Sequence, residues 1–203
     1  MGYLKIKEIL DVILSVFVII ITFPILILIV LLIKVESKGP ALFVQERLGQ
    51  YGKVFRIYKF RTMCINAEKG GVYEVNNDSR VTKVGKVLRR TSIDEFPQFI
   101  NVLKGEMSII GPRPPLTYHP WPLNEYTKVQ KKRFRIKPGI TGLAQINGRK
   151  GISWEQRIKY DVEYVEKMSF GLDVKILFIT IIKAITMKDN VNIGKTSHIK
   201  KNI

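Results

Sequence analysis

A long apolar stretch near the amino terminus constrains the fold of this chain more than any other feature. Residues 12–33 are apolar except for Ser15, Thr22 and Pro24. As a helix rising about 1.5 Å per residue, this stretch would be roughly 33 Å long, which matches the hydrocarbon core of a bilayer. No small-residue cleavage site follows it, so a signal peptide fits poorly. The pattern predicts a membrane anchor, and we assign residues 1–36 to the membrane-embedded segment.

The flanks and the proline leave two topologies open. Lys5 and Lys7 precede the apolar stretch, and Lys34 and Lys38 follow it. Because basic flanks tend to stay cytoplasmic, this symmetry gives no orientation for a simple span. Pro24 removes one backbone hydrogen bond near the middle of the helix and favours a kink. The residues are compatible with an ordinary spanning helix and with a re-entrant helix that returns to the same face.

Charge and cysteine content narrow the class of protein. The chain has 34 Lys+Arg against 17 Asp+Glu, which suits nucleic acid, an anionic membrane surface or phosphorylated substrates as partners. The single cysteine, Cys64, excludes an intrachain disulfide and suits a reducing compartment. His119 and His198 lie far apart, so a histidine- or thiolate-based metal site is not expected. The length allows one compact domain, placed at 37–188 and followed by a disordered tail over 189–203.

The domain is predicted to be α+β and mainly helical. Two β-prone stretches, 41–45 and 54–60, flank a glycine-containing connection and predict a hairpin. Residues 66–80 are polar and are predicted to form a surface loop. Helices are expected near 153–168 and 171–187, and the second is predicted to lie at the membrane interface or pack on the core. We therefore expect a membrane helix joined to a small hairpin-containing catalytic domain with interfacial amphipathic helices.

Two adjacent acids, Asp94 and Glu95, lie in the stretch TSIDEFPQ of this otherwise basic chain. A structural explanation exists, because Ser92 followed three residues later by Glu95 has the form of a helix capping box. Acids in a first helical turn also complement the helix dipole. Apolar residues recur at helical spacing from Ile93 to Leu103, so a helix beginning at this point is predicted.

Basic residues around the acidic pair add a functional explanation. Arg89 and Arg113 lie on either side of it in sequence, and Lys59 and Arg61 come from YKFRT. Because opposite charges lower a carboxyl pKa, Asp94 is expected to stay ionised. Such a carboxylate can act as a nucleophile or hold a divalent cation, and Mg²⁺ suits the site because it prefers oxygen ligands and bridges phosphates. The pattern is compatible with phosphoryl transfer through an aspartyl phosphate-type intermediate.

Two other basic stretches have competing interpretations. The KKRFR run at 131–135 lies in a predicted helix over 125–136, and we interpret it as a solvated or membrane-facing surface. Arg149 in NGRK is compatible with a substrate-phosphate contact and with an ordinary surface arginine. The PGITG stretch lacks the spacing of a P-loop and carries no nucleotide assignment.

Three stretches together resemble the small monotopic phosphoglycosyl transferases, a family of bacterial sugar transferases. The stretches are FRIYKFRTM, GKVLRRTSIDEFPQFINVLKGEMSIIGPRPPL and KPGITGLAQINGR, and they follow an apolar amino-terminal helix in the family's order. The resemblance covers nearly the whole chain except 66–80, 119–130 and the tail. It implies transfer of a sugar phosphate from a UDP-sugar to a polyprenyl phosphate, usually undecaprenyl phosphate, with release of UMP. The implied location is the cytoplasmic face of the bacterial inner membrane.

The resemblance also implies roles for individual residues. Asp94 would be the nucleophile and would bind Mg²⁺, while Glu95 would either place the cation or activate the lipid phosphate. The membrane helix would be re-entrant and broken at Phe23-Pro24, where relatives have Ser-Pro, with Lys7 as a further membrane contact. The implied substrate-binding residues are Lys59, Arg61, Arg89, Arg113, Gln145 and Arg149.

Two rival functions stay open at this point. A membrane-tethered nucleic-acid-binding module suits the formal net charge of +17, although no zinc-finger or RRM signature is present. A non-catalytic scaffold would tolerate Asp94→Asn, whereas an enzyme of the implied kind would lose turnover. For the enzyme we expect UDP-sugar and polyprenyl phosphate as substrates, an anionic membrane as a partner and no nucleic acid. The sequence does not identify the sugar or the oligomeric state, and a homodimer is compatible with it.

Overall fold

The structure, a computed structural model, describes residues 2–67, 78–148 and 151–186. The predicted tail and most of the predicted 66–80 loop lie outside these residues. The described helices include α1 (Gly2–Glu36), α2 (Lys83–Thr91), α3 (Gln98–Leu103), α4 (Leu143–Ile146), α5 (Trp154–Lys167) and α6 (Phe170–Thr186). The strands are β1 (Leu42–Leu48), β2 (Val54–Phe60), β3 (Ser108–Ile110) and β4 (Gly139–Thr141). This composition confirms the mainly helical α+β prediction, including the two last helices.

The hairpin of β1 and β2 is confirmed and is longer than predicted. The strands pair antiparallel from Leu42 opposite Phe60 to the tight connection after Leu48. The outer edge of β2 is covered by a side chain, because Asn101 of α3 accepts from the Tyr58 N–H at 3.1 Å and donates to the Arg56 carbonyl at 2.7 Å. Strand edges need such partners for their backbone groups. The contact fixes β2 against α3.

The helix predicted to begin at Ser92 is divided in the structure. Ser92 ends α2 in the left-handed conformation, with φ 61° and ψ 14°, and its side chain makes no cap hydrogen bond. Residues 93–95 form one 3-10 turn, and α3 begins three residues later. The capping-box prediction is therefore wrong. Its physical reason lies in Glu95, whose carboxylate contacts Lys59 and Arg113 instead of reaching back toward Ser92.

The helix predicted over 125–136 is replaced by two short 3-10 turns, Leu123–Glu125 and Gln130–Phe134. Aromatic packing accounts for the difference, since the Tyr126 and Phe134 rings meet edge to face at 5.2 Å and hold the segment against the core. Arg133 is buried in this turn. The solvated-surface interpretation of KKRFR is therefore wrong for Arg133, although its neighbour Lys131 is exposed.

A short parallel pair, β3 and β4, places the loop that carries Arg113. Ser108 lies opposite Gly139 in the register. The two chains come very close, because a Cβ atom on Gly139 would lie 2.0 Å from the Gly111 nitrogen. The Gly139 N–H also donates to the Pro112 carbonyl at 2.9 Å. Glycine at both positions thus lets the start of the GPRPPL loop lie directly on β4.

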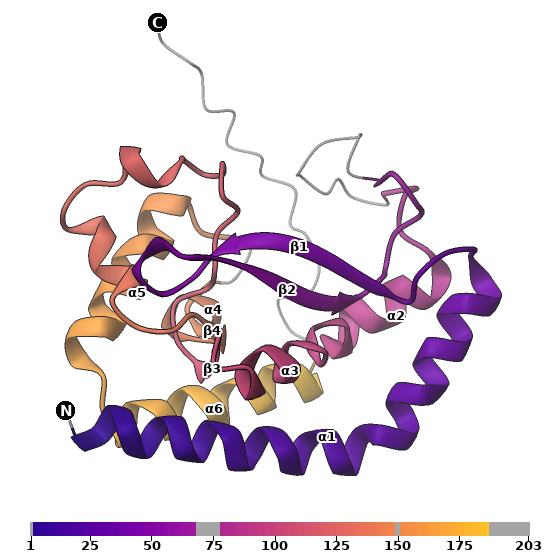
Figure 1. The fold of residues 1–203 in the computed structure, drawn as a ribbon, viewed down its shortest axis with the longest axis horizontal. Coiled ribbons are helices and arrows are strands. Elements are labelled where there is room, and N and C mark those ends of the chain that lie inside the picture. Colours follow the sequence, from indigo (N-terminus) through magenta and orange to yellow (C-terminus); the bar gives the residue numbers. More distant parts are fainter. Residues whose placement is uncertain (1, 68–77, 149–150, 187–203) are drawn as a thin grey trace, which may run out of the picture.

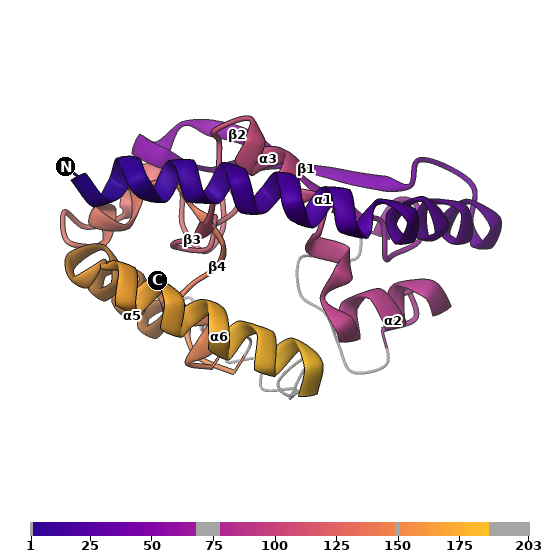
Figure 2. The ribbon, with the colours of Figure 1, turned by 90° about the horizontal axis from the view of Figure 1, so that it is seen from below.

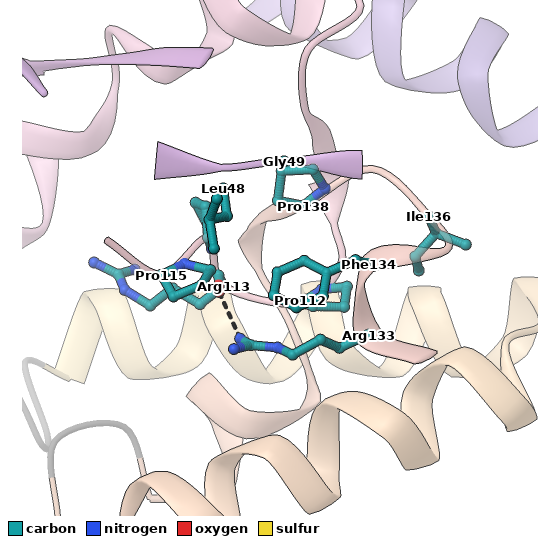
Figure 3. Close-up of a pocket in the computed structure, with 10 residues that line it drawn as sticks. Leu48, Gly49, Pro112, Arg113, Pro115, Arg133, Phe134, Ile136 and Pro138 are labelled. Atoms are coloured by element: carbon teal, nitrogen blue, oxygen red, sulfur yellow. Dashed lines mark hydrogen bonds between the residues drawn. The ribbon is translucent and has the colours of Figure 1, made fainter. Parts of the chain in front are cut away.

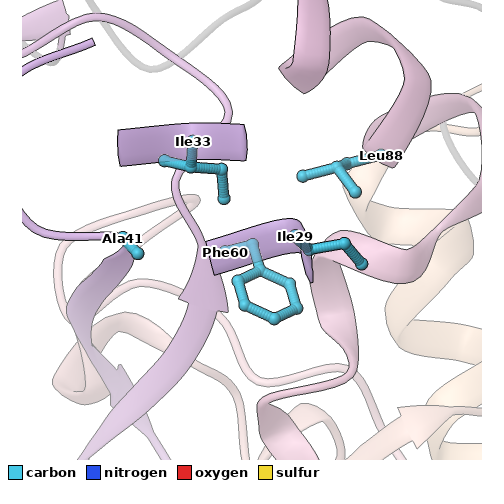
Figure 4. Packing of buried hydrophobic residues seen from close by; sticks show 5 residues of the cluster. All are labelled: Ile29, Ile33, Ala41, Phe60 and Leu88. Carbon is cyan, nitrogen blue, oxygen red and sulfur yellow. The ribbon is translucent and has the colours of Figure 1, made fainter. Parts of the chain in front are cut away.

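The carboxyl-terminal half of α1 packs on the domain. Ile29 and Ile33 are buried in one cluster with Phe60 of β2, Leu88 of α2 and Ala41, as Figure 4 shows. Figure 1 shows α1 running along one side of the molecule and then bending toward the hairpin. Among the described residues, α1 is the one helix long and apolar enough to cross a membrane by length and composition.

The amino-terminal half of α1 also contacts the domain, through buried polar groups. The Lys7 ammonium lies 2.7 Å from a carboxylate oxygen of Asp173 on α6, and both side chains are buried. Asp173 also accepts hydrogen bonds from the Tyr3 and Tyr164 hydroxyls, each at 2.6 Å. Lys7 is therefore engaged inside the protein, which differs from the membrane contact expected for it. Figure 2 shows α1 and α6 on the same side of the molecule, close together where α6 begins and diverging from there.

Pro24 lies inside α1, and the helix continues on both sides of it. Proline cannot donate to the carbonyl four residues earlier, which weakens the helix at that turn. Two residues before it, the Thr22 hydroxyl donates to the Val18 carbonyl at 2.7 Å. Phe23 is exposed. The threonine hydroxyl therefore binds the Val18 carbonyl, whereas the carbonyl that Pro24 leaves without a helical donor is that of Ile20.

Candidate active site

The acidic pair lies in the 3-10 turn between α2 and α3, and Glu95 is its most tightly held member. One Glu95 carboxylate oxygen accepts from the Lys59 ammonium at 2.8 Å and from the Arg113 guanidinium at 2.7 Å. Arg113 also donates to the second oxygen at 3.4 Å. Burial alone would raise the pKa of Glu95, but the charges of Arg113 and Lys59 hold it well below its usual range. Glu95 therefore stays ionised.

Asp94 has a different environment from its neighbour. Its carboxylate has no hydrogen bond or ion pair with any other residue that the structure describes. Burial, reinforced by the charge of Glu95, raises the pKa of Asp94, and Lys59 and Arg89 oppose this rise. The sequence led us to expect that the surrounding cations lower the pKa of Asp94. That direction was wrong, because the effect of burial on the pKa is larger than the effect of the cations. An acid with uncommitted oxygens beside several cations suits a group that reacts with, or binds, a molecule from outside.

Arg89 reaches the pair from α2. Its Nε atom donates to the Thr62 hydroxyl at 2.7 Å. Burial lowers the pKa of Arg89, and the charge of Asp94 opposes this. The close approach of α2 to residue 62 depends on Gly85, because a Cβ atom there would lie 2.1 Å from the Thr62 carbonyl oxygen. Gly85 thus allows α2 to bring Arg89 within electrostatic reach of Asp94.

Arg61 is placed differently from the other predicted substrate-binding residues. Its guanidinium donates to the Ser37 carbonyl and hydroxyl, both at 2.8 Å, and to the Lys38 carbonyl at 2.6 Å. These contacts tie the end of α1 to the hairpin. Two of its guanidinium nitrogens are engaged by this link, and a substrate contact of Arg61 stays a prediction.

The structure describes only one of the two substrate-binding residues predicted from QINGR, Gln145 and Arg149. Gln145 lies on α4, and its amide oxygen and nitrogen are buried without a hydrogen-bond partner among the described residues. An unpartnered buried amide suits a polar ligand, so its substrate role stays a prediction. Arg149 lies outside the described residues. The structure therefore brings Lys59, Arg89 and Arg113 to the acidic pair.

A buried ion pair behind the site was missed by sequence reasoning. Arg133 donates to a carboxylate oxygen of Asp161 on α5 at 2.6 Å, and both side chains are 1% exposed. The same Arg133 nitrogen donates to the Arg113 carbonyl at 2.8 Å, the dashed contact in Figure 3. Burial raises the pKa of Asp161 to about 6, against the opposing charge of Arg133. The helical spacing of Asp161 with buried Ile158 was the one available signal, and it names no partner.

Two further arginines add positive charge near Arg113. Burial, together with the charge of Arg113, lowers the pKa of Arg47 on β1 to about 10. The same two causes lower the pKa of Arg157 on α5 to about 10. Arg157 also lies over the Trp154 ring, 4.5 Å from its centre. Mutual repulsion among these arginines indicates an excess of cationic charge, which favours an anionic ligand such as a phosphate.

The carboxylates limit how a metal ion could bind here. Within the described ranges, no group of three His, Cys, Asp or Glu residues comes together. Both Glu95 oxygens are engaged by cations, whereas the oxygens of Asp94 are not. Mg²⁺ is commonly bound through one or two carboxylates together with water and substrate phosphates. The residues therefore fit Mg²⁺ held by Asp94 and completed by ligands from outside the protein.

Comparison with known proteins gives a family match and several relatives. Residues 2–187 match a family model described as bacterial sugar transferase. A UDP-glucose:undecaprenyl-phosphate glucose-1-phosphate transferase of Klebsiella pneumoniae is 44% identical over 188 residues, which is 90% of this chain and 40% of that protein. A UDP-N-acetylgalactosamine-undecaprenyl-phosphate N-acetylgalactosaminephosphotransferase of Aeromonas hydrophila is 43% identical over 88% of this chain and 43% of its own length. The uncharacterized sugar transferase EpsL of Bacillus subtilis is 41% identical over 95% of this chain and 92% of its own length.

Proposed function

The chain belongs to the bacterial sugar transferase family, and we propose that it transfers a sugar 1-phosphate from a UDP-sugar to a polyprenyl phosphate such as undecaprenyl phosphate. The products would be UMP and a polyprenyl diphosphate-linked sugar, the first membrane-bound intermediate of a polysaccharide or glycoconjugate. The names of two relatives support the reaction class, although the chain spans less than half of their lengths. The observation that carries the proposal is the uncommitted carboxylate of Asp94 beside a Glu95 that is held by two cations.

The proposed chemistry has two displacements at one phosphorus atom. In the first, an Asp94 carboxylate oxygen forms a bond to the sugar-bearing phosphorus, and the bond from that phosphorus to the bridging oxygen breaks. UMP leaves with the bonding electrons, and a phosphosugar remains on Asp94. In the second, an oxygen of the polyprenyl phosphate bonds to the same phosphorus and the carboxylate leaves. Asp94 is thereby restored.

The residues around Asp94 would align and neutralise the reacting groups, which is the main source of acceleration in phosphoryl transfer. Arg89 and Arg113 place positive charge near Asp94 and act against the rise of its pKa. The low pKa of Glu95 makes this carboxylate a weak base. Its role would therefore be to position Lys59 and Arg113, and it would not take a proton from the lipid phosphate. When bound by Asp94, Mg²⁺ would offset the charge of the substrate phosphates.

For the membrane helix, we propose that α1 enters one leaflet and returns to the cytoplasmic face, on which the domain lies. The support is that both halves of α1 contact the same domain, at Lys7 and at Ile33. In a straight helix these residues would lie about 39 Å apart along the axis, enough to place them on opposite sides of a bilayer core. Exposed apolar side chains of α1 and α6, such as Phe17 and Phe178, suit contact with lipid.

The direct test is a UMP-release assay with undecaprenyl phosphate, Mg²⁺ and a panel of UDP-sugars. The wild-type chain in detergent or nanodiscs is expected to release UMP with at least one donor. Asp94→Asn is expected to release none while retaining the wild-type unfolding midpoint, because it removes the nucleophile and leaves a side chain of the same shape. Release by Asp94→Asn at the wild-type rate would contradict the proposal.

A further inference from the structure

The ion pair of Arg133 and Asp161 is the most deeply buried charged contact in the described part of the chain that the proposed chemistry does not use. The two charges are 2.6 Å apart, and both side chains are 1% exposed. The pair joins the 3-10 turn Gln130–Phe134 to the middle of α5. Because desolvating two charges is costly, apolar side chains of similar volume often stabilise a core equally well. The pair therefore needs an explanation beyond stability.

A continuous path of polar contacts leads from this pair to the acidic pair. The Arg133 nitrogen that binds Asp161 also donates to the backbone carbonyl of Arg113 at 2.8 Å. Arg113 then donates to both oxygens of Glu95, at 2.7 and 3.4 Å. Figure 3 shows the Arg133 side chain lying beside the loop that carries Arg113. An apolar residue at position 133 could fill the space but could not donate to this carbonyl.

The neighbouring loop residues make this carbonyl a sensitive point. Arg113 lies between Pro112 and Pro114, in GPRPPL, and prolines donate no backbone hydrogen bond. The loop is held from the other side by Arg47, which donates to the Pro114 carbonyl at 3.2 Å. The Pro112 carbonyl accepts from the Gly139 N–H and the Pro115 carbonyl from the Leu48 N–H, so between them the Arg113 and Pro114 carbonyls depend on side-chain donors. Removing one of them would free the peptide that directs the guanidinium.

We propose that Arg133 and Asp161 are positioning residues for the transfer reaction, which fix the Arg113 peptide and through it the orientation of Glu95 beside Asp94. This inference rests on the proposed function for its kinetic consequence, but its structural part is independent of turnover. Neither residue contacts the reacting atoms. Arg133 holds the Arg113 carbonyl, and Asp161 holds Arg133.

The test replaces the pair by apolar residues of similar size. In Arg133→Met/Asp161→Leu no charge is left buried and unpaired, so the fold is expected to persist. A matched control on the same helix is Lys167→Met/Glu163→Leu, which removes an exposed ion pair at 2.9 Å. Because small misplacements of catalytic groups can cost about a hundredfold in rate, we expect kcat for UMP release to fall about 10- to 100-fold in the first variant. KM should change less than about threefold, and the control should match wild type.

Hydrogen exchange gives a second readout that needs no turnover. Peptides covering 111–116 contain few backbone N–H groups, because three of the six residues are proline. We expect these amides to exchange about tenfold faster in Arg133→Met/Asp161→Leu than in the control, with α6 unchanged. If the wild-type chain releases no UMP, the result counts against the proposed function. In that case the hydrogen-exchange measurement alone tests whether Arg133 and Asp161 position Arg113. Unchanged exchange, or an active wild type whose folded double variant keeps wild-type kcat, would overturn the inference.

Discussion

Replacing Glu95 by glutamine removes one negative charge and nearly preserves the shape of the side chain. The carboxylate now accepts three hydrogen bonds, one from Lys59 at 2.8 Å and two from Arg113 at 2.7 and 3.4 Å. The Glu95 side chain is 13% exposed, so little water can replace a lost contact. The substitution leaves two mostly buried cations facing a neutral amide.

The size of the effect follows from burial. Removing one partner of a buried ion pair costs about 3–5 kcal/mol, because the other charge stays buried without compensation. Glutamine keeps one carbonyl acceptor, and Asp94 keeps a negative charge nearby, so we expect the lower end, about 3 kcal/mol. For a domain of this size, each kcal/mol lowers the unfolding midpoint by about 2–4 °C. Glu95→Gln should therefore unfold about 6–12 °C below wild type.

The assay is thermal unfolding of the nanodisc-embedded chain at neutral pH, with UMP release measured in parallel. Glu166→Gln is the matched control, because Glu166 pairs with Lys132 at 2.6 Å but both side chains are far more exposed, at 51% and 32%. Exposed pairs contribute little, so its midpoint should match wild type. Equal midpoints for Glu95→Gln and wild type would refute the claim that burial makes this contact strong.

Three further outcomes follow from buried contacts. Lys7→Met leaves a buried carboxylate on α6 without its cation, so it should lower the free energy of unfolding of the embedded chain in urea by about 3 kcal/mol. Lys5→Met, at an exposed position, should match wild type, and equal losses in the two variants would contradict this prediction. Gly85→Ala should lower the free energy of unfolding in urea by about 2 kcal/mol and reduce UMP release, since its Cβ would lie 2.1 Å from the Thr62 carbonyl oxygen. If the variant is as stable as wild type, α2 does not approach residue 62 so closely. The folded pKa of Asp161, about 6, lies above its ordinary 3.8, so the folded state binds more protons between these values and the contribution of Asp161 to stability should fall as pH rises from 4 through 6. The measurement is the unfolding midpoint as a function of pH between 4 and 6 for wild type and Asp161→Asn. If the midpoint depends on pH equally in both proteins, the prediction for Asp161 is wrong.

Local sequence pattern was sufficient to predict the elements whose residues interact mainly with near neighbours. The hairpin of β1 and β2 is one such element, because its β-prone residues and short connection lie within 42–60. The helices α5 and α6 are others, since each carries a continuous helical pattern. The long apolar helix α1 was also predictable from its composition.

Long-range contacts explain the predictions that differed. The turn at Ser92 could not be anticipated, because Glu95 is drawn away from a capping role by Lys59 and Arg113 from distant parts of the chain. Lys7 resembled a lipid-facing lysine until the fold brought Asp173 to it, across 166 residues. In each case a charge found a buried partner that no local pattern reveals.

In the candidate site, too, the sequence identified some residues, and long-range contacts that it does not reveal account for the others. Motif resemblance named Lys59, Arg89 and Arg113, and the structure brings all three to the acidic pair. It did not name Arg133 or Asp161, because their contact with the site passes through a backbone carbonyl. A carbonyl partner leaves no signature in side-chain spacing.

The central claim is that the Asp94 carboxylate forms a covalent bond to phosphorus. Peptide mass spectrometry of the chain, quenched after incubation with a UDP-sugar it accepts and no lipid acceptor, tests this most directly. The account predicts a sugar-phosphate adduct on the peptide that contains Asp94, formed with release of one UMP per adduct and lost when undecaprenyl phosphate is added. UMP release that requires the lipid acceptor and leaves Asp94 unmodified would instead indicate direct transfer between the two substrates.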